Sequence, residues 1–206
     1  MPNISRPTGY RPVKHVNGSP FNGQLTLYVF LAADATAVAV GDLVDLSGAA
    51  DANGIPAITR ATSATGPFLG AVVGFLPSGT SPVDGTLLTG TADLSLSGFR
   101  PASTLRYALV ADGTDVVFEA QGSGTFLFTA DPGLNANTTT TAAGANGNAG
   151  VSNMQVDLTT KAVTATLGLK ILGASRRVDQ DLADSANVKI EVMINQHRKN
   201  QGIAGV

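Results

Sequence analysis

The sequence lacks cysteine and tryptophan entirely, and only 14% of its 206 residues are charged. The absence of cysteine excludes thiol catalysis, iron–sulfur clusters and cysteine-bearing zinc sites. The apolar run at residues 68–76 contains two glycines and is about half as long as a membrane-spanning helix. The first residues carry no apolar stretch behind their positive charge, so we expect neither a signal peptide nor a membrane partner.

The low charge predicts an unusually neutral surface, because average chains carry about 25% Asp, Glu, Lys and Arg. Such a surface favours burial of one part of it in an assembly. Hydrophobic residues make up 43% of the chain and the mean hydropathy is +0.17, which argues against disorder. A globular chain of this length buries roughly 70% of its unfolded surface, so we expect one large domain.

The charges are sorted along the chain. Residues 1–33 have a net charge of +3, residues 34–157 of −8 and residues 158–206 of +3. One interpretation is that both basic ends lie against the acidic middle of the same monomer. The other is that a basic end reaches an acidic patch on a neighbouring copy or partner. Nucleic acid is not an expected partner, because phosphate binding needs a dense basic stripe and these cations are scattered.

Apolar and polar residues alternate with a period of two over much of the chain. This pattern predicts half-buried strands at residues 187–195 and 163–171. Residues 24–31 are apolar on both faces, which predicts a strand covered on both sides. Further short strands are expected at residues 37–40, 43–46, 68–75, 105–110, 115–120, 125–129 and 154–158.

The pair Asp112-Gly113 separates two of these predicted strands, and a two-residue Asp-Gly connection is a strong hairpin signal. We therefore expect a hairpin between residues 105–110 and 115–120. Helical periodicity extends over no more than a turn or two, at residues 102–107 and 179–186. Many short strands with glycine-rich turns indicate an all-β fold, a jelly-roll-like β-sandwich or barrel.

Two segments do not show strand patterns. Residues 1–23 carry four prolines and no alternation, which favours an extended N-terminal arm over a strand. Residues 132–156 contain no charged residue; they predict a flexible surface loop, with ordering by another subunit as the alternative. The expected organisation is thus an arm over residues 1–23 and a single β-sandwich or jelly-roll domain over residues 24–206.

The sequence offers little catalytic chemistry. The two histidines, His15 and His197, lie near the ends of the chain, where we expect solvent or interface positions rather than a catalytic triad. The acidic triplet Asp179, Asp181 and Asp184 follows two arginines, so local ion pairing neutralises it as readily as a cation would. We predict no enzymatic activity, no catalytic residues, no metal site and no cofactor.

Several stretches resemble the structural cement, or head decoration, proteins of short-tailed and related tailed bacteriophages. They are residues 9–15, 17–20, 22–24, 41–44, 54–56, 59–61, 69–75, 106–107, 117–119, 171–173 and 192–197. The block at residues 9–24 is the most specific of them. The resemblance spans nearly the whole chain.

The resemblance implies a non-enzymatic virion protein that binds the outside of the capsid at joints between capsomers and stabilises the shell. It would be made in the cytoplasm of the bacterial host. The implied partners are the major capsid protein and a second copy of the chain, a dimer being favoured over a trimer. We expect interface residues among the following cationic and titratable side chains: Arg6, Arg11, Lys14, His15, Arg176 and Arg177. The alternative is a β-sandwich adhesion or carbohydrate-binding module of a virion.

Overall fold

The computed structural model describes residues 3–77, 98–141, 150–200, 202 and 205–206. Its elements are all strands: β1 Arg11–His15, β2 Thr26–Phe30, β3 Val38–Ala39, β4 Leu43–Ala50, β5 Pro56–Arg60, β6 Gly70–Phe75, β7 Phe99–Arg100, β8 Arg106–Ala111, β9 Val116–Ser123, β10 Thr125–Phe126, β11 Asn135–Thr138, β12 Val156–Ala162, β13 Leu169–Ala174, β14 Ser185–Ala186 and β15 Lys189–Ile194. The predicted all-β class, with a barrel, is confirmed. No helix occurs in the described residues, and hence none long and apolar enough to cross a membrane.

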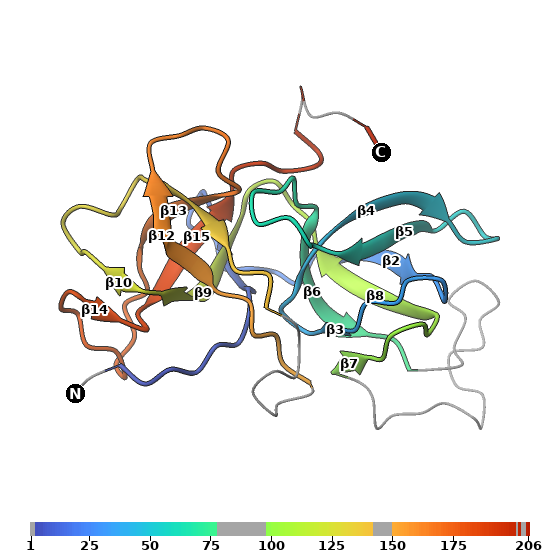
Figure 1. Cartoon of the computed structure of the whole chain (residues 1–206), viewed down its shortest axis with the longest axis horizontal. Coiled ribbons are helices and arrows are strands. Elements are labelled where there is room, and N and C mark those ends of the chain that lie inside the picture. The colour runs from blue at the N-terminus through green and yellow to red at the C-terminus, as the bar shows by residue number, and fades with distance from the viewer. Residues whose placement is uncertain (1–2, 78–97, 142–149, 201, 203–204) are drawn as a thin grey trace.

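Apart from two small two-stranded sheets, β3-β7 and β10-β14, the strands fall into two bodies that lie side by side (Figure 1). One is a closed barrel in the order β2-β5-β4-β6-β8. The other is a six-stranded sheet in the order β1-β9-β12-β11-β13-β15, and β15 also pairs with β9. The sequence predicted one body for residues 24–206, because alternation identifies strands but not the sheet to which each belongs.

Two predicted strands match the observed burial pattern. In and beside β15, the side chains of Val188, Ile190, Val192 and Ile194 are buried, as the alternation at residues 187–195 predicted. Strand β2 is covered on both sides, because Val29 belongs to a different buried cluster from its neighbours in the strand. Both strands follow directly from the period-two geometry of β-structure.

The predicted hairpin at Asp112-Gly113 does not form. Strand β8 pairs with β2 and β6, whereas β9 pairs with β1, β12 and β15. The chain therefore crosses from the barrel to the six-stranded sheet at this turn. An Asp-Gly pair specifies a reversal of the backbone, but the free edges of the sheets decide which strands pair.

The first half of the predicted strand at residues 163–171 is also wrong. Val163 is 86% exposed in a turn, and β13 begins only at Leu169. The two predicted helical turns are absent as well, since residues 106–111 form β8 and residues 185–186 form β14.

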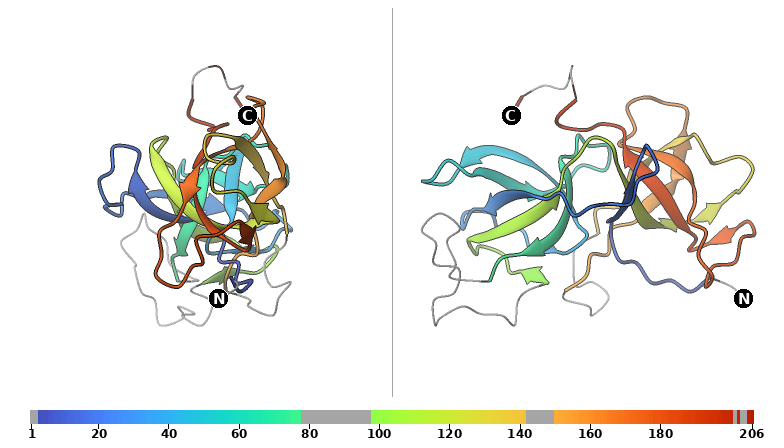
Figure 2. Two further views of the ribbon diagram at one scale, coloured as in Figure 1. Left: turned by 90° about the vertical axis from the view of Figure 1, so that its left-hand side faces the viewer. Right: turned by 180° about the vertical axis from the view of Figure 1, so that it is seen from behind.

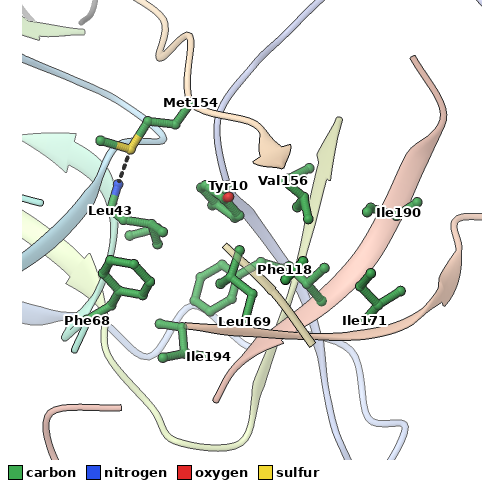
Figure 3. Close-up of a cluster of buried hydrophobic side chains, with 14 of the residues drawn as sticks. Tyr10, Leu43, Phe68, Phe118, Met154, Val156, Leu169, Ile171, Ile190 and Ile194 are labelled. Atoms are coloured by element: carbon green, nitrogen blue, oxygen red, sulfur yellow. Dashed lines mark hydrogen bonds between the residues drawn. The ribbon is translucent and has the colours of Figure 1, made fainter. Parts of the chain in front are cut away.

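The N-terminal segment contains a strand, contrary to the prediction. Strand β1 pairs antiparallel with β9, with a bulge between Pro12 and Lys14 that accommodates the proline. Tyr10, just before it, is 1% exposed and packs in the larger core beside Phe118 and Leu169 (Figure 3). The described part of this segment is thus integrated into the six-stranded sheet of its own chain.

The uncharged segment at residues 132–156 also contributes a strand. Within it, β11 pairs with both β12 and β13. Its buried polar side chains form hydrogen bonds: Asn135 Nδ2 donates to the Thr164 carbonyl, and Thr138 Oγ1 donates to the Gln155 carbonyl. Residues 142–149, where the predicted loop is richest in glycine, lie outside the described residues.

Backbone hydrogen bonds from both ends of the chain join the two bodies. The amide of Tyr10 donates to the Gly41 carbonyl over 2.8 Å. Near the C-terminus, the Phe68 amide donates to the Gln196 carbonyl and the Arg198 amide donates to the Phe68 carbonyl, each over 2.8 Å. Segments near both ends of the described chain therefore hold the barrel against the six-stranded sheet.

Candidate interaction site beside the N-terminal segment

The nominated interface residues fall into three groups. Arg6, Arg11 and Arg177 line one pocket, Lys14 and His15 form pairs on the sheet, and Arg176 is exposed but does not line the pocket. Lys14 Nζ lies 2.7 Å from Glu191 Oε2, and His15 Nδ1 lies 3.0 Å from Asp115 Oδ2.

The C-terminal cations are also paired within the chain. The guanidinium of Arg198 holds the Asp45 carboxylate, with 2.7 Å between Nε and Oδ1, and Lys199 Nζ lies 2.5 Å from Asp112 Oδ2. The C-terminal cations thus meet acids of the middle of the chain, as the first interpretation of the charge pattern predicted, whereas Lys14 of the N-terminal part pairs with Glu191 of the C-terminal part. The second interpretation, in which a basic end reaches an acidic patch on a neighbouring copy or partner, then applies only to cations that the fold leaves without a carboxylate.

Within the described chain, Arg6 and Arg11 are two such cations, and both line a pocket of about 540 Å³, which we call the N-terminal pocket. Its walls come from the segment at residues 3–11, from β9 and from the segment at residues 177–189. The lining residues are Asn3, Ile4, Arg6, Thr8, Arg11, Glu119, Arg177, Asp179, Gln180, Asn187 and Lys189. Three parts of the chain that are distant in sequence therefore build one site.

Hydrogen bonds hold the N-terminal wall of the pocket in place. The Arg6 amide donates to Gln121 Oε1 over 2.7 Å, and Gln121 itself is fully buried. At the other end of this wall, Asn3 Nδ2 donates to Ser185 Oγ of β14 over 3.0 Å, and the Asp181 amide donates to Asn3 Oδ1 over 2.9 Å. Figure 2 shows this end of the chain beside β14 from behind.

Arg177 is the one pocket arginine that binds carboxylates of the described chain. Its Nη1 lies 2.9 Å from Glu119 Oε1, and its Nε lies 2.9 Å from Asp179 Oδ1. The hydrogen bonds to Asp179 and then to Glu119 raise the pKa of Arg177, and those from Arg177 lower the pKa of Asp179. Because Arg177 is partly exposed, these pairs contribute little to stability, but they fix one guanidinium at the rim.

Lys189 lies deeper, on the outward face of β15. Its Nζ donates to the Arg6 carbonyl over 2.6 Å. Burial lowers the pKa of Lys189, and the charges of Arg177 and Arg11 lower it further against the opposing effect of Glu119. A lysine and two arginines thus lie close together in the pocket, beside Glu119.

Exposed apolar side chains surround this positive region. Ile4, a lining residue, is 67% exposed, and both Val178 and Leu182 of the adjoining segment are exposed. Val178 stands between two lining residues, and Leu182 follows the residue that is bonded to Asn3. Arginine is enriched at protein interfaces, so arginines beside exposed apolar side chains are compatible with a protein-binding surface.

The acidic triplet does not form a cation site. Asp179 binds Arg177, Asp184 Oδ1 accepts the Phe128 amide over 2.8 Å, and the Asp181 amide is bonded to Asn3. Among the described residues, no three His, Cys, Asp or Glu side chains gather where they could hold a metal ion.

His197 does not occupy the solvent or interface position expected for it. It is 1% exposed at the junction of the two bodies, and its Nδ1 accepts the Lys199 amide over 3.1 Å. Burial, and then the charge of Lys199, lower its pKa below the ordinary value. Nearby, burial would raise the pKa of Asp112, but hydrogen bonds from Lys199, Tyr28 and Thr26 lower it.

These shifts predict two separate losses of stability in acid. A histidine whose pKa is lowered in the folded state stabilises the fold above its unfolded pKa of about 6.5, and this contribution is lost as the pH falls below that value. The contribution of Asp112 is lost only as the pH falls below about 3.9. We therefore expect the free energy of unfolding in urea to decrease in two stages as the pH is lowered from 8 to 3.

The variant His197→Asn separates the two stages, because asparagine can accept the Lys199 amide but does not titrate. We expect this variant to lose the decrease just below about pH 6.5 while keeping the decrease below about pH 3.9. An unchanged upper stage in His197→Asn would contradict the assignment to His197.

Comparisons with protein-family models, with curated proteins and with solved structures find no match for this chain. The candidate site therefore stands on its own geometry.

Sequence reasoning identified three of the pocket residues but missed Asn3, Glu119, Asp179 and Lys189. The predicted strand at residues 187–195 did place Lys189 on the face opposite the apolar set. That signal marks a residue as outward-facing, but it does not say which other segment lies across from it.

Proposed function

We propose that this chain is a non-enzymatic capsid decoration, or cement, protein of a tailed bacteriophage. It would bind the outer surface of the head at joints between capsomers and stabilise the shell. Its partners would be the major capsid protein and a second copy of the chain, as a dimer. The proposal is supported by the sequence resemblance, and the all-β fold with its barrel is compatible with it.

Two of the stretches that carry the resemblance, residues 9–15 and 41–44, contact each other at the junction of the two bodies. Gly9 has a φ of +66°, and a Cβ atom built on it would lie 2.3 Å from the carbonyl oxygen of Gly41. The neighbouring Tyr10 amide donates to that same oxygen. Residues 9–15 and 41–44 therefore constrain each other sterically.

The contact between residues 9–15 and 41–44 also supports a binding role that requires the two bodies to be held rigidly together. Both termini connect the barrel to the six-stranded sheet, so the two bodies present their surfaces in one fixed arrangement. A protein that holds capsomers together must keep its binding surfaces at constant separation, because preorganised surfaces lose less entropy on docking.

The alternative, a carbohydrate-binding or adhesion module, receives less support. Sugar recognition favours exposed aromatic rings as stacking platforms. The chain has no tryptophan, its three tyrosines are buried, and none of its eight phenylalanines is exposed.

Binding to undecorated phage heads tests the proposal. We expect the purified protein to cosediment with heads that lack it, to saturate at a fixed number of copies per head, and to raise the temperature at which the heads release DNA. Light scattering of the free protein should give the mass of a dimer. An absence of binding to heads, together with binding on a glycan array, would favour the alternative.

A further inference from the structure

We propose that the N-terminal pocket binds the carboxylate side chains of an acidic segment of a partner protein. The inference deepens the proposed function, since the partner would then be the capsid protein. Three observations support it. The pocket has a net positive charge, the guanidinium groups of Arg6 and Arg11 have no partner among the described residues, and most of the described acidic side chains already accept hydrogen bonds within the monomer.

The pocket holds more positive than negative charge. Four cationic side chains, those of Arg6, Arg11, Arg177 and Lys189, share it with two carboxylates, those of Glu119 and Asp179. Its net charge is therefore +2. Opposite charge from outside the chain is the direct way to neutralise it.

Two of the cations have donors to spare. In the part of the chain that the structure describes, the guanidinium groups of Arg6 and Arg11 make no hydrogen bond or ion pair, although the backbone of Arg6 is fixed at both its amide and its carbonyl. An exposed guanidinium whose backbone is held in place is preorganised for a planar, bidentate acceptor.

Carboxylates suit this pocket better than a nucleic-acid backbone. Arg177 already binds two carboxylates at the rim, so the same chemistry operates there. The acids Glu119 and Asp179, which also line the pocket, would repel a polyphosphate chain. An excess of two charges matches two carboxylates, and the exposed Ile4 and Val178 can pack against the stems of acidic side chains.

A second copy of this chain is a poor source of those carboxylates. Most of the described acids already accept hydrogen bonds within the monomer. Those with a lysine or arginine partner include Asp34 with Arg100, Asp45 with Arg198, Asp112 with Lys199, Asp131 with Lys161, Glu191 with Lys14, and both Glu119 and Asp179 with Arg177. The acidic segment would therefore come from a different protein.

Binding of a short acidic peptide to the full chain tests the inference. The probe is a tetraglutamate peptide blocked at both ends, with blocked tetraglutamine as the uncharged control, and the readout is isothermal titration calorimetry at low salt. We expect the wild type to bind tetraglutamate and not tetraglutamine. The double variant Arg6→Gln/Arg11→Gln should bind at least about tenfold more weakly, because two charge-assisted contacts are lost.

The variant Lys170→Gln is the matched control for the single variants Arg6→Gln and Arg11→Gln, because each of the three removes one positive charge. Lys170 lies on β13, does not line the pocket and forms no ion pair among the described residues. It should bind the peptide as the wild type does. The melting temperature of each variant shows whether it is folded, and Arg6→Gln and Arg11→Gln should both keep that of the wild type, since neither side chain supports the fold.

Several outcomes would overturn the inference: no binding of tetraglutamate by the wild type, equal binding by the double variant, or stronger binding of a short DNA oligonucleotide that the double variant loses. Binding to phage heads separates this inference from the proposed function. Heads that bind wild type and double variant equally would leave the function standing and refute the pocket. If the wild type binds tetraglutamate but does not bind heads, the pocket is supported and the proposed function is refuted.

Discussion

Replacing Tyr10 by alanine is expected to lower the free energy of unfolding by about 3–5 kcal/mol, the usual cost of truncating a buried aromatic residue. The ring is 1% exposed and packs among the buried side chains of β9, β12 and β13 (Figure 3). Its loss would leave a cavity where the N-terminal segment meets the six-stranded sheet. Because small domains have only about 5–15 kcal/mol of stability in total, the variant should melt at a much lower temperature.

The variant Tyr10→Phe separates the ring from its hydroxyl group. Tyr10 Oη donates to Thr138 Oγ1 over 2.7 Å in a buried pair, and burial raises the pKa of this phenol. Loss of one such hydrogen bond costs about 1 kcal/mol, so Tyr10→Phe should retain most of the stability. Urea denaturation measures both values. A Tyr10→Ala variant as stable as Tyr10→Phe would contradict the position of the ring in the core.

The same position changes how the N-terminal segment can be studied. If residues 1–23 were a free arm, their deletion would remove binding and leave the body intact. In the structure, deletion would remove β1 from its pairing with β9 and Tyr10 from the core. Substitutions that leave the backbone unchanged, such as Arg11→Gln, therefore test the role of this segment in binding, whereas its deletion tests folding.

The limits of sequence reasoning are visible in two strands. Strand β15 was predictable, because alternate residues face the core and the others face outward. Strand β11 was not, because its buried side chains are asparagine, alanine and threonine, and hydrogen bonds of this asparagine and threonine reach carbonyl groups of the Thr164 and Gln155 segments. A strand with buried polar side chains carries no hydrophobic period, so its composition resembles that of a loop.

The candidate site shows a similar limit. The segregation of charge along the chain pointed to Arg6 and Arg11. Arg176 and Arg177 were expected at an interface because they lie just beyond the predicted strand at residues 163–171. Only contacts between segments distant in sequence, such as that of Arg177 with Glu119 and that of Lys189 with the Arg6 carbonyl, select Arg177 over Arg176 and add Lys189. Such contacts depend on the pairing of β1 and β15 with β9, which local patterns do not specify.

Arg100→Met is expected to destabilise the barrel by about 3–5 kcal/mol, the cost of removing one partner from a buried, bonded charge. The Arg100 side chain is fully buried, and its guanidinium donates to the carbonyls of Leu31, Asp34, Thr36 and Thr104 over 2.5–2.9 Å. It also lies over the Phe30 ring, 5.2 Å from the centroid. Its removal would leave four carbonyl groups without this donor where the loop after β2 joins the barrel.

Two further variants distinguish loss of the fork of donors from loss of charge. Arg100→Lys keeps the charge, but an ammonium group has three donors on a flexible stem and cannot replace a planar fork that reaches four carbonyls. Its expected loss is therefore close to that of Arg100→Met. Arg60→Met removes an arginine with two longer bonds, of 3.2 and 3.4 Å, and should cost about 1 kcal/mol. Full stability in Arg100→Lys would mean that charge alone, and not the geometry of the donors, holds the loop to the barrel.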